Sequence, residues 1–358
     1  MGRARLRDLG ITIGVLPPGP HNAITDVPGV LVGQTTLIYD EPRVARTGVT
    51  IILPRGHGRP VDFPFAGYHI FNGCGEMTGL AWVHESGLLM SPIALTNTNQ
   101  VGLVRDAIVQ YAVDRFGEMS FFHKLPVVAE TWDGWLSDPD SFHVTREDVY
   151  GAIDSAAAGP VAEGNTGGGT GMICHGFKGG TGTASRVAET PSGRYTVGAL
   201  VQSNYGNREL FRVDGVPVGR EIGPDHTPTP WQAEPVSSSI IIVLATDAPL
   251  IPLQCRRLAQ RATVGLARVG GVGHNGSGDI FIAFATGNVT PFDHEGLLDL
   301  KMLPHGDMNP LFEAAAEAVE EAILNALTAA ETTTGFRGHT AHALPLEELQ
   351  RVMRKMRT

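Results

Sequence analysis

The stretch from residue 236 to residue 250 constrains the fold of this chain more than any other part of the sequence. It reads VSSSIIIVLATDAPL, so three serines lead directly into the apolar run 240–244. That run is short and rich in β-branched residues, which predicts a buried strand. The Thr-Asp-Ala-Pro sequence after it predicts a turn into a helix. We therefore expect Ser239 at the first position of a central strand.

Two interpretations of Ser239 are open at this point. A small polar residue at the start of a strand needs no chemical role. Alternatively, the chain is cut immediately before Ser239, which would give one residue both a hydroxyl and a free α-amine. Such an amine has an unperturbed pKa of about 7.7–8.0, which suits a general base near neutral pH. A nucleophile activated by its own terminal amine is a known arrangement for acyl transfer.

The composition describes an ordinary globular protein with a large core. Of the 358 residues, 42% are hydrophobic and 18% are charged, which allows one large domain or two. The formal net charge is −10 and the basic residues form no long stripe, which argues against nucleic acid as the main partner. No apolar run is long enough to span a membrane, and the apolar segment 11–16 ends at two prolines. We expect neither a nucleic-acid partner nor a membrane partner.

The cysteines and histidines bear on location and metal binding. The three cysteines, Cys74, Cys174 and Cys255, stand far apart, and an odd number of thiols cannot all pair. This favours a reducing compartment, so we expect a cytoplasmic protein. The 13 histidines form no metal-binding spacing such as His-Glu-x-x-His. The sequence predicts no metal and no other cofactor.

Two glycine-rich stretches, 164–171 and 177–183, invite comparison with nucleotide-binding loops. The P-loop requires Gly-Lys-Ser/Thr, but Lys178 is preceded by Phe177 and followed by Gly179. The pattern of the dinucleotide fingerprint is also not met. We therefore do not expect nucleotide binding. The glycines would either allow close backbone packing or expose N–H groups to a substrate oxygen.

The order of the remaining segments predicts stacked sheets covered by helices rather than a doubly wound parallel sheet, because strands occur in pairs between helices. Strands are expected over 30–38, 49–53, 80–83, 88–95, 125–129, 195–202 and 280–285. Helices are expected over 98–116, 146–158, 253–269, 311–330 and 345–356. Residues 56–75 are expected to form a loop that lines a site.

The segment 130–135, Glu-Thr-Trp-Asp-Gly-Trp, places a carboxylate beside two tryptophans at the end of a predicted strand. A surface turn with half-buried aromatic rings would explain it. A cleft wall of Glu130, Trp132 and Trp135 that holds a cation, such as a substrate ammonium, would explain it as well. Both interpretations stay open.

Three polar residues at predicted strand ends are further candidates. Asn204 either caps a turn or presents its amide N–H to a developing oxyanion. Ser277 and Asp279 share a face if the strand at 280–285 extends back to Ser277, because side chains repeat every two residues. A hydroxyl beside a carboxylate can orient a group or relay a proton, although a polar turn is the simpler explanation of the spacing.

Several of these stretches occur together in the order typical of one protein family. They are GTG at 169–171 with FKGG at 177–180, QSNYG at 202–206, SII at 239–241 with ATDAP at 245–249, and GSGD at 276–279. ETWDG at 130–134 and DVPGV at 26–30 also fit. Over nearly its whole length, the chain resembles the L-aminopeptidase/D-amidase/D-esterase and β-peptidyl aminopeptidase family.

The resemblance implies an α+β fold, an α/β/β/α four-layer sandwich related to N-terminal-nucleophile hydrolases and to ornithine acetyltransferase. It implies a single catalytic domain, 1–358, that cleaves itself between Ser238 and Ser239. The products would be an α chain, 1–238, and a β chain, 239–358, that stay together. It also implies a homotetramer of such αβ pairs.

The resemblance assigns roles to the candidate residues. Ser239 would be the nucleophile and the new N-terminus, and Asn204 would donate to the oxyanion. Ser277 and Asp279 would orient the nucleophile and its amine and handle protons. On the substrate side, Glu130 would hold the free amino group, and one of the two tryptophans, Trp132 or Trp135, would shape the pocket.

The implied reaction is the release of N-terminal amino acids, β- or D-residues included, from small peptides, amino acid amides or esters through an acyl-enzyme on Ser239. Two alternatives remain. One is an acyltransferase of the ornithine acetyltransferase type, which uses a threonine nucleophile. The other is a non-catalytic protein of the same fold that binds an amino compound.

Two positions depart from the family pattern. Ser238 stands where Gly or Asn is typical, and Asp279 stands where Glu is an alternative. A residue with a Cβ tolerates fewer backbone conformations at a strained bond. Because Ser237 and Ser238 precede Ser239, the sequence leaves the cut site open by one residue.

Overall fold

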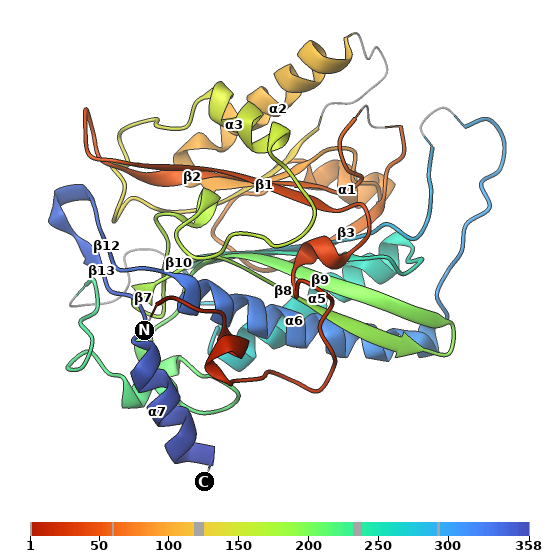
Figure 1. The fold of residues 1–358 in the computed structure, drawn as a ribbon. Helices are drawn as coiled ribbons and strands as arrows, with labels where there is room; N and C mark the ends of the chain where they lie inside the picture. The colour runs from red at the N-terminus through yellow and green to blue at the C-terminus, as the bar shows by residue number, and fades with distance from the viewer. Residues whose placement is uncertain (1, 59–60, 118–124, 232–237, 292–293, 358) are drawn as a thin grey trace.

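The computed structural model describes residues 2–58, 61–117, 125–231, 238–291 and 294–357. It has four layers, as Figure 1 shows: two helices, a four-stranded sheet, a five-stranded sheet and two further helices. This order confirms the expected α/β/β/α sandwich. Serine 237, one of the residues that left the cut site open, lies outside the described residues.

The first sheet contains four strands, and two helices cover its outer face. In spatial order the strands are β1 (Leu31–Tyr39), β2 (Ala45–Leu53), β4 (Ile93–Asn97) and β5 (Val127–Thr131). Neighbours are antiparallel except for β4 and β5, which run parallel. The covering helices are α2 (Val101–Phe116) and α3 (Arg146–Asp154).

The second sheet contains five strands and carries the serine-rich stretch at its centre. In spatial order they are β3 (Phe65–Gly73), β11 (Ser277–Ala285), β10 (Ser238–Thr246), β9 (Gly193–Asn204) and β8 (Gly180–Thr190). β10 and β11 run parallel, and the other pairs are antiparallel. Its outer face is covered by α5 (Pro252–Val269) and α6 (Met308–Ala329).

The remaining elements lie at the periphery of the two sheets. They are α1 (Leu80–Ser86), α4 (Val218–Glu221), α7 (Leu346–Arg357), the pair β6 (Ile173–Cys174) and β7 (Phe177–Lys178), and the pair β12 (Thr333–Thr334) and β13 (Thr340–Ala341).

Strand β10 is apolar on both faces because it is buried on both faces. Ile240, Ile242 and Leu244 belong to the core beneath α5 and α6, whereas Ile241 and Val243 belong to the core between the two sheets. This alternation follows from the two-residue repeat of a strand. It also puts the side chain of the second residue of β10 on the face that looks toward the first sheet.

Three expectations from the sequence are wrong. Residues 80–83 form the start of helix α1, which lies between Gly79 and Gly87, both in left-handed conformation. A run of four apolar residues does not distinguish a strand from a buried helix turn. Residues 56–75, expected as a loop, contain the edge strand β3, whose two glycines conceal the strand pattern. Of the strand expected over 88–95, only residues 93–95 belong to β4.

Candidate active site

Ser239 lies at the second position of β10, at the end of the central strand of the sheet. Its backbone pairs with Asn204 on β9 and with Gly278 on β11. Its side chain is buried, with 4% of the residue exposed. The expected position at the start of a central strand is therefore confirmed, with β10 beginning one residue earlier, at Ser238.

The hydroxyl of Ser239 lies beside the peptide bond that precedes it. Its Oγ donates a hydrogen bond to the carbonyl oxygen of Ser238 at 2.5 Å. The same Oγ accepts a hydrogen bond from the backbone N–H of Gly278 at 3.1 Å. These two contacts fix the hydroxyl next to the carbonyl group that it would attack in a self-cleavage reaction.

Ser277 and Asp279 lie on one face of β11, because the strand extends back to Ser277. The Ser277 hydroxyl donates to Asp279 Oδ1 at 2.6 Å, and the two residues are 1% and 2% exposed. Burial raises the pKa of Asp279 to about 6, and the hydrogen bond from Ser277 opposes that rise. The pair thus forms a proton-accepting group one strand away from Ser239.

The side-chain amide of Asn204 is held in one orientation by two partners. Its Oδ1 accepts from the backbone N–H of Ile173 at 2.8 Å, and its Nδ2 donates to the carbonyl oxygen of Trp132 at 3.0 Å. An amide nitrogen carries two hydrogens. Among the described residues only Trp132 accepts from Nδ2, so its second hydrogen is available on a residue that pairs directly with Ser239.

A cavity of about 440 Å³ opens at Ser239. Two of the predicted substrate-binding residues, Glu130 and Trp132, line it together with Ser239. The remaining described lining residues are Cys74, Gly75, Glu76, Thr98 and Gly276.

Glu130 is the buried carboxylate of this cavity. Its Oε1 accepts from the backbone N–H of Glu76 at 3.0 Å, and its Oε2 accepts from the hydroxyl of Thr98. Burial raises the pKa of Glu130, and these two hydrogen bonds act in the opposite direction. A substrate ammonium beside this carboxylate would favour its ionised form, because an opposite charge stabilises it.

The structure separates the two tryptophans. Trp132 lines the cavity, but Trp135 is not among its described lining residues. The Trp135 ring stacks on His339, with ring centroids 3.9 Å apart, and meets Trp231 edge to face at 5.8 Å. Trp132 therefore lies at the cavity, where a cleft wall would need it, while Trp135 packs in a separate aromatic cluster.

Two residues that hold Glu130 in place, Thr98 and Glu76, were not predicted from the sequence. Thr98 lies within a segment expected to be helical, and Glu76 follows the segment expected to be a loop. Nothing in the local sequence links either residue to Glu130. Their meeting depends on how the end of β3 and the end of β4 pack at the edge of the two sheets.

The glycine-rich stretches serve close backbone packing. A Cβ added to Gly169 would lie 2.1 Å from the backbone nitrogen of Thr181, and one added to Gly179 would lie 2.4 Å from the carbonyl oxygen of Ser203. Ordinary side chains do not fit at such distances. Of the two explanations that the sequence left open, the structure supports close packing at these positions.

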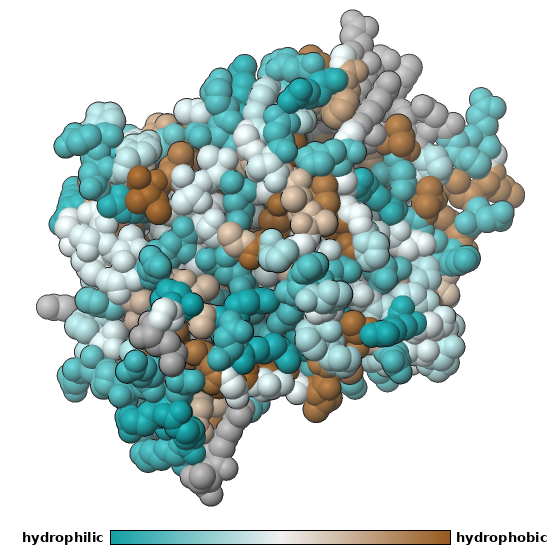
Figure 2. Space-filling view, viewed as in Figure 1, coloured by the Kyte–Doolittle hydropathy of each residue, from teal (hydrophilic) through white to brown (hydrophobic). Residues whose placement is uncertain are grey.

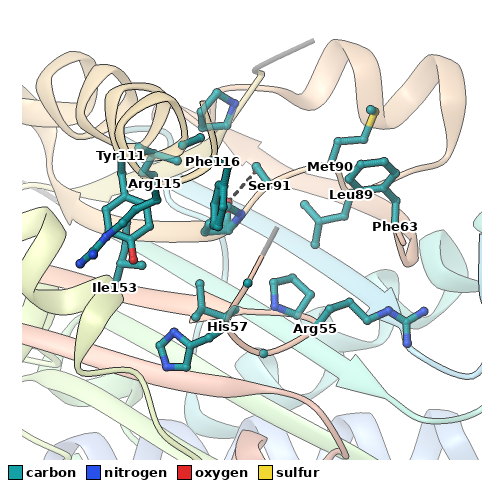
Figure 3. Close-up of a pocket in the computed structure, with 18 of the residues that line it drawn as sticks. Arg55, His57, Phe63, Leu89, Met90, Ser91, Tyr111, Arg115, Phe116 and Ile153 are labelled. Atoms are coloured by element: carbon teal, nitrogen blue, oxygen red, sulfur yellow. Dashed lines mark hydrogen bonds between the residues drawn. The ribbon is translucent and has the colours of Figure 1, made fainter. Parts of the chain in front are cut away.

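A larger cavity, of about 630 Å³, lies near α2 and α3, and Figure 3 shows it. Several of its polar groups already have partners: Arg115 contacts Asp154 at 2.8 Å, the Tyr111 hydroxyl donates to Asp154 at 2.6 Å, and His57 bonds to the carbonyl oxygen of Ala156 at 2.7 Å. None of the site residues predicted from the sequence lines it. The smaller cavity at Ser239 is therefore the candidate active site.

Two absences hold for the described part of the chain. No group of three or more His, Cys, Asp or Glu residues there is arranged to hold a metal ion. Among the same residues, no helix has the length and apolar character needed to cross a membrane.

Comparisons with known proteins agree with this geometry. The profile of peptidase family S58 matches residues 22–341. A curated relative, the β-peptidyl aminopeptidase BapA of Sphingosinicella microcystinivorans, is 47% identical over 370 residues, which cover 99% of this chain and 92% of the relative.

Solved structures with the same fold extend the comparison. A β-aminopeptidase from a Burkholderia species is 50% identical with a TM-score of 0.92, covering 98% of this chain and 99% of that chain. The L-aminopeptidase D-Ala-esterase/amidase of Ochrobactrum anthropi, described as a variant of the Ntn hydrolase fold, is 45% identical with a TM-score of 0.91, covering 98% of each chain. The resemblance seen in the sequence and the N-terminal-nucleophile-hydrolase-like sandwich are confirmed. This chain belongs to peptidase family S58.

Proposed function

We propose that this protein is a self-processing aminopeptidase that releases N-terminal amino acids from small peptides, amino acid amides or esters through an acyl-enzyme on Ser239. The observation that carries the proposal is the position of the Ser239 hydroxyl. It lies against the carbonyl of Ser238 and at the wall of a cavity that also contains a buried carboxylate, Glu130. The names of the relatives, which are aminopeptidases, support the same reaction class.

The first reaction is self-cleavage between Ser238 and Ser239. The Ser239 oxygen bonds to the carbonyl carbon of Ser238, the bond from that carbon to the nitrogen of Ser239 breaks, and the hydroxyl proton ends on the departing nitrogen. Water then hydrolyses the ester. The products are a carboxylate on Ser238 and a free α-amine on Ser239, and no cofactor is needed to balance the step.

In turnover, the same hydroxyl attacks the carbonyl carbon of the substrate's N-terminal residue, and the bond from that carbon to the next nitrogen breaks. The α-amine of Ser239 takes the hydroxyl proton, directly or through Ser277, and passes it to the leaving amine. Water then hydrolyses the acyl-enzyme, which releases the amino acid and restores the Ser239 hydroxyl. The free N–H of Asn204 and a backbone N–H stabilise the tetrahedral oxyanion. Glu130 holds the substrate ammonium, and Trp132 bounds the space for the N-terminal side chain.

The two chains produced by this cut would remain associated, because both contribute strands to one sheet and the strands of the β chain lie between strands of the α chain. In the five-stranded sheet, β10 and β11 belong to 239–358, whereas β3, β9 and β8 belong to 1–238. Each inner strand of the β chain thus pairs with a strand of the α chain. We expect the two chains to co-elute in size-exclusion chromatography and to separate only in denaturant.

We also propose that the αβ pairs assemble into a homotetramer in the cytoplasm. The extended segment 294–302 exposes four large apolar side chains, Leu297, Leu298, Leu300 and Met302, with Leu297 97% exposed. Figure 2 shows brown apolar residues at the edge of the molecule where this segment lies in Figure 1. Clustered exposed apolar residues mark protein–protein contacts, so this segment supports assembly.

The alternatives from the sequence are less well supported. An acyltransferase of the ornithine acetyltransferase type uses threonine where this chain has Ser239, and the comparisons give relatives named as aminopeptidases. An assay for acetyl transfer to glutamate would distinguish it. A binding protein that lacks catalysis would leave the chain uncut and would bind aminoacyl amides without hydrolysing them.

The decisive test is an intact mass spectrum of the purified protein beside the Ser239→Ala variant. We expect the wild type to give two chains, 1–238 and 239–358, and the variant to stay whole. The variant Ser192→Ala, which removes a hydroxyl from the surface, is the matched control and should be cut normally. A cut displaced by one residue would move the nucleophile to Ser238, and an uncut wild-type chain would refute the proposal.

A further inference from the structure

We infer that Ser238 is a positioning residue for self-cleavage and that its hydroxyl acts through Ser277. The inference rests on the proposed function, because it concerns the same peptide bond. It assigns a role to the residue that immediately precedes the proposed cut.

The hydrogen bond between the two serines has a defined direction. Ser238 and Ser277 are register partners on the parallel strands β10 and β11, and their Oγ atoms lie 3.2 Å apart. A serine hydroxyl has one hydrogen, and that of Ser277 is donated to Asp279 at 2.6 Å. Ser277 therefore accepts from Ser238, and the chain runs from Ser238 through Ser277 to the carboxylate.

The ionisation of Asp279 supports this direction. The pKa of Asp279 is raised to about 6 by burial, so the carboxylate is largely ionised at pH 7 and only accepts hydrogen bonds. A protonated Asp279 would be free to donate to Ser277 and would leave the direction undefined. His274 acts electrostatically on Asp279 and lowers the pKa of that carboxyl, against the effect of burial.

The chain of hydrogen bonds immobilises the residue before the scissile bond. The Ser238 side chain is tied to β11, and its carbonyl oxygen accepts from the Ser239 hydroxyl at 2.5 Å. The Ser239 hydroxyl is itself tied to β11 by the N–H of Gly278 at 3.1 Å. Both sides of the bond to be cut are thus anchored on one neighbouring strand, which keeps attacking oxygen and carbonyl together.

The same arrangement releases an acceptor when the bond is cut. Ser238 becomes the C-terminal residue of the α chain and is no longer held by the peptide bond. When its hydroxyl leaves, the lone pair of Ser277 that it occupied is free to accept from the new α-amine of Ser239. The Ser277 oxygen would then accept from the Ser238 hydroxyl in the precursor and from the α-amine of Ser239 in the mature enzyme.

The test uses the full-length chain made by cell-free synthesis, with the fraction cut followed over time by mass spectrometry. Three variants separate the hydroxyl from the Cβ: Ser238→Ala removes the hydroxyl, Ser238→Thr keeps it, and Ser238→Gly removes both. We expect Ser238→Ala to be cut about tenfold more slowly, which corresponds to about 1.4 kcal/mol. Ser238→Thr should be cut at a rate within about threefold of wild type, because threonine keeps the hydroxyl. Such a rescue would show that the hydroxyl matters rather than the size of the side chain.

A double-variant comparison tests the route through Ser277. If Ser238 acts through Ser277, adding Ser238→Ala to Ser277→Ala should not slow cleavage further, because coupled residues are not additive. Thermal unfolding of each change in the uncut Ser239→Ala background shows whether the fold is kept. Ser192→Ala, the surface change used above, is the control for loss of a serine hydroxyl elsewhere.

The outcomes separate the two proposals. If Ser238→Ala is cut at the wild-type rate, the inference about Ser238 is wrong. A wild-type chain cut before Ser239 would still support the proposed function in that case. Faster cleavage of both Ser238→Ala and Ser238→Gly would overturn the inference too, because the Cβ would then be the limiting feature. A wild-type chain that stays uncut would overturn both.

Discussion

Replacing Asn204 with alanine tests the oxyanion assignment most directly. Asn204 is buried, its backbone pairs with Ser239 across the sheet, and its side chain has one amide hydrogen that is not used by Trp132. Loss of one preorganised oxyanion donor costs about 2.7–4 kcal/mol of barrier, or roughly 10²–10³ in kcat. We expect Asn204→Ala to lose that factor in kcat, with a smaller change in KM.

The same substitution also costs stability, and the structure gives the size of that effect. The backbone N–H of Ile173 loses its acceptor and the carbonyl of Trp132 loses its donor. A buried polar group left without a partner costs about 1–3 kcal/mol, so the free energy of unfolding should fall by roughly 2–6 kcal/mol. Activity must therefore be compared with that of a variant of similar stability.

Gln202→Ala supplies the comparison. Gln202 lies two residues earlier on β9, is buried, and donates through Nε2 to the carbonyl of Thr96 and the hydroxyl of Thr131, both at 2.8 Å. Its backbone partner is Ile241, not Ser239. This variant should lose comparable stability and retain kcat.

The assay is hydrolysis of aminoacyl p-nitroanilides, with kcat expressed per cut chain as measured by mass spectrometry. This normalisation removes any effect of Asn204 on self-cleavage. A kcat for Asn204→Ala within about threefold of wild type, or an equal loss in Gln202→Ala, would refute the assignment of Asn204 to the oxyanion.

Three further predictions concern charge. Glu130→Gln should raise KM at least about tenfold and leave kcat within about threefold of wild type. The reason is that a charge that holds the ammonium equally in the ground state and the transition state contributes to binding but not to kcat. An unchanged KM in steady-state kinetics would contradict this. Burial raises the pKa of Asp133 to about 7, so wild type loses stability as pH rises from about 4 to about 7. In the uncut background, the stability of Asp133→Asn relative to the protein with Asp133 should therefore rise by roughly 3 kcal/mol between pH 5 and pH 8, and a difference in urea midpoint that is the same at both pH values would argue against it. Arg186 is fully buried between Glu317 at 3.0 Å and Glu321 at 2.5 Å. Arg186→Met should therefore lower the free energy of unfolding in urea by about 3–5 kcal/mol, because it leaves buried carboxylates without their partner. A variant with the wild-type urea midpoint would show that these ion pairs do not contribute to stability.

The positions of Ser239, Ser277 and Asp279 in their strands were predictable because each depends on local periodicity. The β-branched run after Ser239 is apolar on both faces, which only a central buried strand requires. Ser277 and Asp279 share a face once the strand is extended by three residues, and the structure extends it so. Both predictions follow from the two-residue repeat and need no knowledge of distant contacts.

The cavity was less predictable because it forms where the two sheets meet. Glu130 is held by Thr98 and by the N–H of Glu76, which lie 32 and 54 residues away in the sequence. The short segment with two tryptophans divides between two environments, Trp132 at the cavity and Trp135 on His339. Composition at a strand end indicates that aromatic rings are half-buried, but the packing of other elements decides which ring faces the substrate.

The position of the proposed cut reconciles cleavage with rigidity. A free N-terminus is normally mobile, yet a catalytic amine must be held within a fraction of an ångström of its working position. Because Ser239 is the second residue of β10, cleavage before it removes only Ser238 from the strand. Ser239 itself keeps its pairing with Asn204 on one side and Gly278 on the other. A cut before the start of β10 would leave a loose N-terminus outside the strand. A cut further along would remove ladder pairs from the centre of the sheet. Cleavage before the second residue of β10 therefore gives a free amine on a residue that stays fixed.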